Sequence, residues 1–212
     1  MYARSKWVVP LSLVACGFLS GCQPHKAAFS GFLNDYSKLQ PNPVVEGAMY
    51  YASPSPSLKD YSKFQIDPVI VHFAPNAKGT AFDPTKLAKL TDFAHDEMVK
   101  ALSKRYQVVD GPGPGVLRIR AALTDIKKTT PAMNIHPATK LSGIGLGGAS
   151  MEAEALDSQS GVRVIAVVDT RMGNRLSIGA GLSELGHAKQ VIKHWIDRFV
   201  KRVDEAHGFA AK

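Results

Sequence analysis

The residues with the most distinctive chemistry are two cysteines near the amino terminus, Cys16 and Cys22, and the sequence contains no others. A disulfide between them would close a very small loop and add little stability, because the gain depends on restricting a long loop in the unfolded chain. Two thiols alone make an incomplete zinc site, and their spacing is not that of a zinc knuckle. We therefore interpret the pair as part of a processing signal.

The residues around these cysteines have the composition of a bacterial export signal. Arg4 and Lys6 form a short positive segment, and the mostly apolar run 7–18 follows. This run is too short to span a bilayer, which distinguishes it from a transmembrane helix. Residues 1–21 are therefore predicted to be a signal peptide.

The end of this signal, LSGC at residues 19–22, resembles the lipobox of bacterial lipoproteins. The resemblance implies cleavage between Gly21 and Cys22 and a diacylglycerol on the Cys22 sulfur, and further acyl chains then make the anchoring durable. Gln23 stands where some sorting signals have aspartate, which favours delivery to the outer membrane. The alternatives are a second lipobox-like stretch ending at Cys16, an ordinary cleaved signal and an uncleaved anchor.

Two glutamates are the first candidates for catalysis, since glycosidases use paired carboxylates. Glu152 and Glu154 alternate along a predicted strand, so both side chains lie on one face. We interpret this face as exposed to water, with Arg118, Arg120 or Arg163 near the carboxylates. A small periplasmic hydrolase that uses these carboxylates or a histidine is the alternative function.

Other motifs that could carry chemistry are weaker. His187 and His194 lie two turns apart on one predicted helix, too far to share a metal ion. The run GIGLGG at 143–148 has the spacing of a dinucleotide fingerprint, but a proline-containing loop precedes it and a predicted strand follows. We therefore predict a glycine loop or bulge there, and no catalytic residue, metal site or cofactor.

The formal net charge of +8 could indicate a nucleic-acid partner. An exported lipoprotein meets little nucleic acid, so we expect none and favour anionic lipids or acidic partners. The basic side chains on the outer face of the last predicted helix are Lys189, Lys193, Arg198, Lys201 and Arg202. Near a membrane surface each such charge contributes about 1 kcal/mol. A solvated helix face is the alternative.

The segment 128–149 has no predicted element, and loops of this length in compact domains are usually functional or disordered. It carries apolar side chains and a histidine that a solvated loop does not need: Met133, Ile135, His136, Leu141, Ile144 and Leu146. We predict that this loop contacts a partner protein or lipid. A flexible connection, or one that folds onto its own domain, is the alternative.

Hydrophobic periodicity predicts the elements that must position these groups. Pro68 indicates an edge or a bulge in the first strand, and Asp83 and Ser183 are the expected helix caps. The predicted strands cover 64–73, 106–110, 116–128, 151–156 and 162–172, and the predicted helices cover 83–106 and 183–206. This order predicts a two-layer α+β fold, with a mostly antiparallel sheet of about five strands and two main helices packed on one face.

The predicted organisation beyond the signal peptide has two parts. Residues 22–62 comprise the lipidated cysteine, a tether and an irregular segment rich in proline and tyrosine. The prolines exclude long regular elements there, while the aromatic residues indicate packing on the domain. Residues 63–207 form the α+β domain.

Several stretches occur in a recognisable order: GFLNDYSKL, IDPV, GPGPGVLRIRAALTD, MEAEALDSQSG and VVDTR. Together they resemble a family of proteobacterial lipoproteins known only as a domain of unknown function (DUF3313-like). The resemblance supports the lipoprotein interpretation and supplies no catalytic residues. We therefore predict a non-enzymatic binding or assembly module, anchored by lipid in the outer membrane and facing the periplasm. Its expected partner is an envelope protein, a glycan or a lipid.

Overall fold

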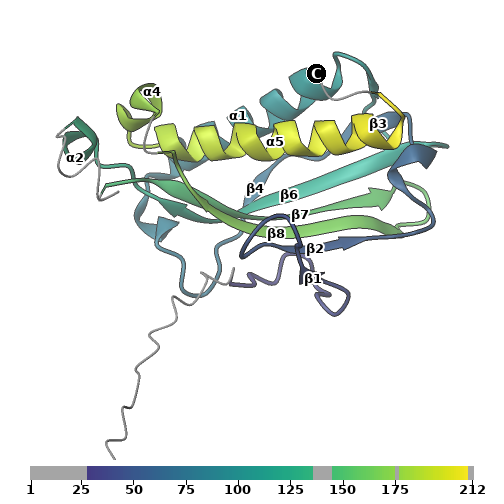
Figure 1. The fold of residues 1–212 in the computed structure, drawn as a ribbon, viewed down its shortest axis with the longest axis horizontal. Helices are drawn as coiled ribbons and strands as arrows, with labels where there is room; N and C mark the ends of the chain where they lie inside the picture. The colour runs from purple at the N-terminus through teal and green to yellow at the C-terminus, as the bar shows by residue number, and fades with distance from the viewer. Residues whose placement is uncertain (1–27, 136–144, 175–176, 210–212) are drawn as a thin grey trace, which may run out of the picture.

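The computed structural model describes residues 28–135, 145–174 and 177–209. Within these ranges one mixed sheet is covered on one face by two long helices, α1 (Pro84–Leu102) and α5 (Gly186–Ala206) (Figure 1). The segment 28–39 packs on the opposite face of the sheet (Figure 1). The predicted two-layer α+β class, with two main helices on one face, is confirmed.

The described residues form eight strands in the order β1-β2-β8-β7-β6-β3-β5, with β4 also pairing with β6. Their bounds are β1 Gln40–Pro41, β2 Met49–Ala52, β3 Lys63–Ile66, β4 Ile70–Val71, β5 Gln107–Val108, β6 Val116–Lys127, β7 Gly148–Asp157 and β8 Arg163–Met172. The long strands β6, β7 and β8 pair antiparallel, whereas β3, β4 and β5 pair parallel to their neighbours. Short helical turns complete the chain: η1 Leu58–Asp60, η2 Gly79–Ala81, α2 Pro131–Ile135 and α4 Ile178–Gly181.

The sheet has more strands than predicted for two reasons. The proline- and tyrosine-rich segment contributes β1 and β2 along the free edge of β8. The strand predicted over 64–73 is divided into β3 and β4, and Pro68 lies in the break between them. Proline lacks the amide proton that a continuous ladder needs, so a break at this position is expected.

The two long helices begin differently. Asp83 caps α1 as predicted, because its side chain accepts hydrogen bonds from the amides of Thr85 (2.8 Å) and Lys86 (3.2 Å). The prediction that Ser183 caps the last helix is wrong. Residues 178–181 form the separate turn α4, and the Ser183 carbonyl closes a second turn with the amide of Gly186, where α5 begins.

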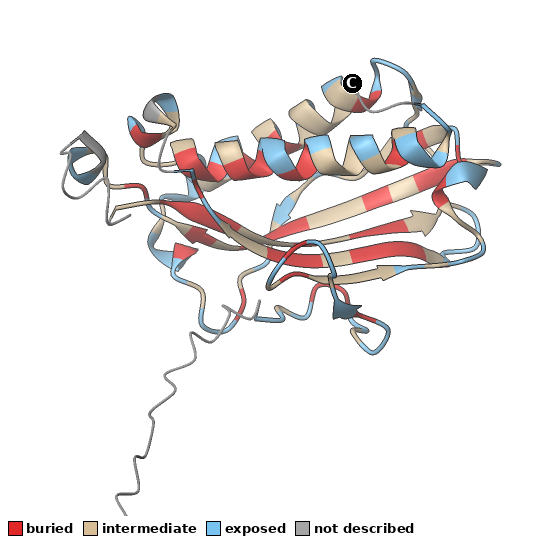
Figure 2. Cartoon of the chain, in the orientation of Figure 1, coloured by how far each residue is buried: buried red, intermediate tan, exposed pale blue. Residues whose placement is uncertain are grey.

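Both faces of the sheet are covered, one by the long helices and the other by the amino-terminal segment. Under the helices, two contiguous apolar clusters join α1 and α5 to the strands. On the other face, Phe32, Leu33 and Leu39 are buried against Ala122 and Val168 of the central strands. Figure 2 shows the resulting alternation of buried and partly buried residues along β6, β7 and β8. The predicted packing of the aromatic-rich segment on the domain is confirmed.

Candidate functional site

The middle of the sheet carries small side chains on the face beneath the helices. Ala121 on β6 is the cross-strand partner of Ala153 on β7, and Ala153 is in turn the partner of Val167 on β8. Ala94 of α1 faces the same space from above. Methyl groups do not reach across the gap between sheet and helices, so a cavity of about 100 Å³ with almost entirely apolar walls remains.

The incomplete burial of the side chains around this cavity shows that the space is unfilled. Ala121, Ala153 and Val167 lie on central strands under a helix layer, where close packing normally buries side chains. Each is nevertheless only partly buried, like Phe199 on α5 above them. By contrast, Ala122 and Ala166 on the opposite face of the same strands are fully buried. The void therefore belongs to the helix side of the sheet.

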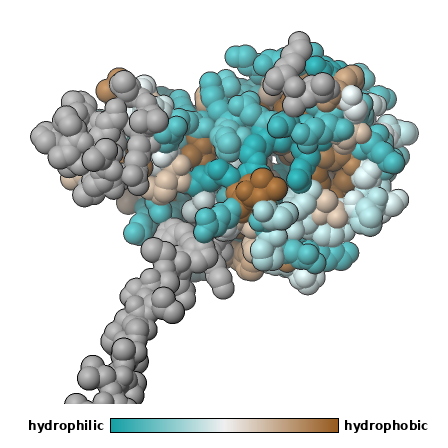
Figure 3. All heavy atoms as spheres, in the orientation of Figure 1, coloured by the Kyte–Doolittle hydropathy of each residue, from teal (hydrophilic) through white to brown (hydrophobic). Residues whose placement is uncertain are grey.

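A cleft of about 390 Å³ adjoins this cavity, between α5 and the strands β8 and β2. The cavity and the cleft share the lining residues Met151, Ile165, Val167, Trp195 and Phe199. In the space-filling view, apolar groups show among polar ones on the face that carries α5 (Figure 3). The volume of the cleft falls in the range of small-molecule sites.

Charged groups surround the cleft. Asp169 on β8 is 2% exposed, and its Oδ2 accepts hydrogen bonds from Trp195 Nε1 (2.9 Å) and Arg171 Nε (2.8 Å). The guanidinium of Arg198 lies 3.9 Å from the same oxygen. Arg202 lies over the ring of Tyr50, with its guanidinium carbon 4.4 Å from the ring centroid. Two elements distant in sequence, α5 and the β2–β8 edge, therefore build this rim together.

The electrostatics of the rim favour an anion. Burial lowers the pKa of Arg198, and repulsion from Arg171 lowers it further, while Asp169 opposes both effects. The buried Oδ1 of Asp169 has no hydrogen-bond partner among the described residues. Arginine stays protonated in proteins, so Arg198 remains a cation in a partly dry place. The carboxylate of Asp169 faces the guanidinium groups of both Arg171 and Arg198. One carboxylate cannot neutralise two guanidinium groups, so positive charge remains at the mouth of the cavity.

The structure separates the five predicted basic residues into two groups. Arg198, Lys201 and Arg202 line the cleft. Lys189 and Lys193 instead extend over the ring of Phe93, at 4.8 and 5.7 Å from its centroid. Sequence periodicity could place all five on the outside of a helix. It could not show that three of them border an apolar cavity, because the other wall comes from β2 and β8.

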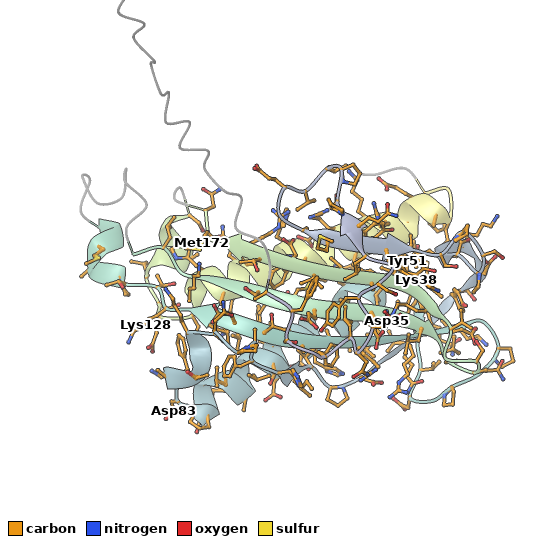
Figure 4. All side chains as sticks on the ribbon, turned by 90° about the horizontal axis from the view of Figure 1, so that it is seen from below. Asp35, Lys38, Tyr51, Asp83, Lys128 and Met172 are labelled. Atoms are coloured by element: carbon orange, nitrogen blue, oxygen red, sulfur yellow. The ribbon has the colours of Figure 1, made fainter. Side chains whose placement is uncertain are left out.

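The two glutamates are not on a wet face, and that prediction is wrong. Glu152 is 0% exposed and accepts hydrogen bonds from Tyr36 Oη (2.6 Å) and from the amides of Ser30 (2.5 Å) and Leu33 (3.3 Å). The amino-terminal segment covers this face and is attached there to the buried carboxylate of Glu152. Figure 4, seen from below, shows Lys38 and Tyr51 of the same face, with the ammonium 5.6 Å from the ring centroid.

Glu154, 5% exposed, has the arginine partners that the sequence indicated. Its carboxylate accepts hydrogen bonds from Arg120 Nη1 at 2.7 Å and from Arg163 Nε at 2.9 Å. Arg163 also donates to the carbonyls of Leu33 and Asp35. Both glutamates thus hold the amino-terminal segment in place. The signal that could have revealed this is the run Phe32–Leu33, which needs an apolar surface to cover.

The two histidines of the last helix have different surroundings. His187 is buried, and its Nδ1 accepts a hydrogen bond of 3.2 Å from the amide of Gly147, while His194 is exposed beside the cleft region. In the described part of the chain, no group of three or more histidine, cysteine, aspartate or glutamate residues could hold a metal ion. A β-carbon on Gly147 would lie 2.3 Å from Thr129 Oγ1, so close approach requires this glycine. The strand β7 follows directly, as expected for a glycine loop.

The remaining predicted residues are only partly described. Met133 lies in α2 and is 42% exposed, and Leu146 is partly buried. Ile135 ends α2. His136, Leu141 and Ile144 lie outside the described residues, as do Gly21 and Cys22 at the predicted lipidation site. Of the helices described, none has the length and apolar character to cross a membrane.

The chain is similar to a curated bacterial lipoprotein and, at low identity, to several solved structures. The chain is 26% identical over 198 residues to the uncharacterized lipoprotein YdcL of Escherichia coli K12, covering 84% of this chain and 88% of that protein. The PelC dodecamer from Paraburkholderia phytofirmans is 14% identical, with a TM-score of 0.40, covering 69% of this chain and 93% of that one. Protein XCC0632 of Xanthomonas campestris, of the DUF330 family, is 11% identical, with a TM-score of 0.41, covering 74% and 91%.

The fold, the order of the stretches quoted above and the relation to a bacterial lipoprotein point to one family. The family described as "Protein of unknown function (DUF3313)" matches residues 28–199, which includes every long strand and most of α5. The chain belongs to the DUF3313 family.

Proposed function

We propose that this protein is a lipid-anchored protein of the bacterial envelope, held in the outer membrane by Cys22, whose periplasmic domain binds a partner in the cleft beside α5 without catalysing a reaction. Similarity to a lipoprotein supports the anchor. The observation that carries the binding role is the cleft of about 390 Å³ continuous in its lining with an apolar cavity. Stable domains seldom keep such space in their cores, because an unfilled void forfeits packing contacts.

A hydrolase is less well supported by the same geometry. A general acid or base must reach the substrate by a direct or water-mediated hydrogen bond. Glu152 is enclosed beneath the amino-terminal segment, and Glu154 is held by two arginines. Both carboxylates lie on the face of the sheet opposite the cleft. His187 is buried against Gly147. These groups therefore serve as structural attachment points.

In-cell crosslinking tests the binding role. Val44 is 84% exposed and lines the rim of the cleft, so a photo-crosslinking amino acid at this position leaves the core intact. Val162 is the matched control, since it is 47% exposed in the turn between β7 and β8 and lines no cleft described above. We expect irradiation of cells to produce an adduct at Val44 that is absent at Val162. Equal labelling at the two positions would refute binding in the cleft.

The loop that includes α2 is a second proposed contact region, and the same experiment tests it. Met133 is exposed on α2 and is a suitable position for the photo-crosslinking amino acid. A specific adduct there would support the predicted partner-binding role of the loop. Labelling no stronger than at Val162 would rule this role out and leave the cleft proposal intact.

A further inference from the structure

The walls of the cavity limit the chemistry of its occupant. The residues around it contribute almost only carbon atoms, among them Ala121, Ala153, Val167 and Phe199. A glycan or a peptide backbone placed there would lose its hydrogen bonds to water and find no replacement, which is unfavourable. An apolar cavity of this kind stays dry and accepts apolar ligands. A flexible hydrocarbon chain therefore suits the cavity, and a sugar does not.

The mouth of the cavity has the opposite character. Arg198 borders the cleft 3.9 Å from Asp169, a carboxylate already engaged by Arg171 at 2.8 Å. Arg202 lies over Tyr50, and no carboxylate of the described residues forms an ion pair with it. Lys201 is 3.8 Å from Glu205 on the same helix. The two arginines are thus the groups at the rim with charge left to neutralise.

Apolar walls below and unneutralised guanidinium groups above match a molecule with one apolar end and one anionic end. We propose that the cleft beside α5 binds an anionic single-chain amphiphile, or one chain of an anionic lipid, with the end of the acyl chain in the cavity, the rest of the chain along the cleft and the anionic head group at Arg198 and Arg202. This inference rests on the proposed binding role of the cleft and names its ligand. Each methylene moved from water into the cavity strengthens binding about fourfold.

The fluorescence of Trp195 can report directly on the bound acyl chain. It lines both the cavity and the cleft, and the sequence contains one other tryptophan, Trp7, in the predicted signal peptide. Bromine atoms on an acyl chain quench indole fluorescence on contact. We would purify the full-length lipidated protein from membranes in detergent and titrate it with lysophosphatidylglycerol that carries a brominated chain. Because Trp195 is only 7% exposed, quenching requires entry of the chain.

Matched ligands and variants separate the two halves of the proposal. We expect saturable quenching by brominated lysophosphatidylglycerol and about tenfold weaker binding of brominated lysophosphatidylcholine, whose head group has no net charge. Brominated stearate distinguishes a carboxylate from a phosphate head group, and tight binding of either supports the proposal. R198Q and R202Q should each weaken the binding of the anionic ligands about tenfold. K104Q, which removes an exposed charge away from the cleft, should leave their binding unchanged.

Substitutions that fill the cavity test whether the acyl chain enters it. A153L should abolish quenching while the circular dichroism spectrum is retained, and V167F is the second variant if A153L does not fold. Quenching that is unchanged in both filling variants would overturn the inference. Equal quenching by lipids with charged and uncharged head groups would also overturn it. If a protein or glycan is trapped at Val44 and no brominated chain quenches Trp195, the binding role stands and the lipid assignment fails. If Val44 traps nothing specific, the binding role itself fails.

Discussion

The indole Nε1 of Trp195 on α5 donates a hydrogen bond of 2.9 Å to Oδ2 of Asp169 on β8. Arg171 donates to the same oxygen at 2.8 Å, from the strand that carries Asp169. A single carboxylate oxygen therefore ties the helix layer to the sheet at the entrance of the cavity. Because both Trp195 and Asp169 are almost completely buried, this contact sets how α5 lies over β8.

W195F should lower the free energy of unfolding by about 2 kcal/mol, because it removes a buried hydrogen bond to a charged group while keeping most of the packing. Urea unfolding of the full-length protein measures the change. D169A, which removes the acceptor oxygen, completes a double-mutant cycle. The two effects should be non-additive, since the residues share one contact. Strict additivity would show that the contact does not join helix and sheet.

E152Q should loosen the amino-terminal segment. The carboxylate of Glu152 accepts hydrogen bonds from Tyr36 and from two backbone amides, and a neutral amide replaces these charge-assisted bonds with weaker ones. We expect a loss of about 1–3 kcal/mol and faster hydrogen exchange over residues 30–39. E46Q, on an exposed side chain, is the control. Unchanged exchange over this segment would contradict the role assigned to Glu152.

Mild acid should destabilise the protein through His187. Burial lowers the pKa of His187 below its ordinary 6.5, with a backbone hydrogen bond at Asn174 opposing the shift. The unfolded chain then binds a proton that the folded chain rejects, so stability is full above about pH 6.5 and falls as the pH drops below it. H187Q should remove only part of this dependence in urea midpoints measured from neutral to mildly acid pH, because burial lowers the pKa of His194 in the same direction. H95Q, on α1, is the matched histidine replacement.

Alkali should destabilise the protein through Tyr61. Burial raises the pKa of Tyr61 from 10.0 to about 12, and its hydrogen bond of 3.0 Å to Asp157 adds to the effect. The folded state keeps the phenol proton longer than the unfolded chain, so stability is lost as the pH rises from 10 towards 12. Y61F should remove only part of this loss. Burial also raises the pKa of Tyr106, which lies beside Asp204. Y51F serves as the control; an equal alkaline slope in Y61F would disprove the assignment.

Cys22 should carry the lipid. C22S should abolish labelling by an alkyne-bearing fatty acid and leave an uncleaved precursor on a gel, because a hydroxyl cannot replace the thiol in the lipidation step. The chain supplies its own control, since C16S should be labelled and processed normally. Loss of labelling in C16S with normal labelling in C22S would move the lipidation site to the first cysteine.

Local patterns were enough for much of the fold. The spacing of apolar residues located α1 and α5, and the alternation around the DSQSG turn located the hairpin of β7 and β8. Residue type alone puts the start of α5 three residues too early, because Ser183 resembles a cap but its carbonyl closes a different turn. Pairings across long separations could not be derived, such as β3 parallel to β6 or β2 against β8. They depend on which edge of the sheet is free after the long strands have paired.

The sequence by itself predicted the processing signal and determined the α+β class, the family resemblance and the basic character of α5, because each depends on residue types a few positions apart. The tertiary structure decided the rest. It placed an amino-terminal segment over Glu152 and turned an apparently wet face into a buried one. It also set Ala121 against Ala153 under the helices and brought Arg198 and Arg202 to the mouth of the resulting cavity. A cavity is a property of surfaces that fail to meet, and only the packing of distant elements determines where that happens.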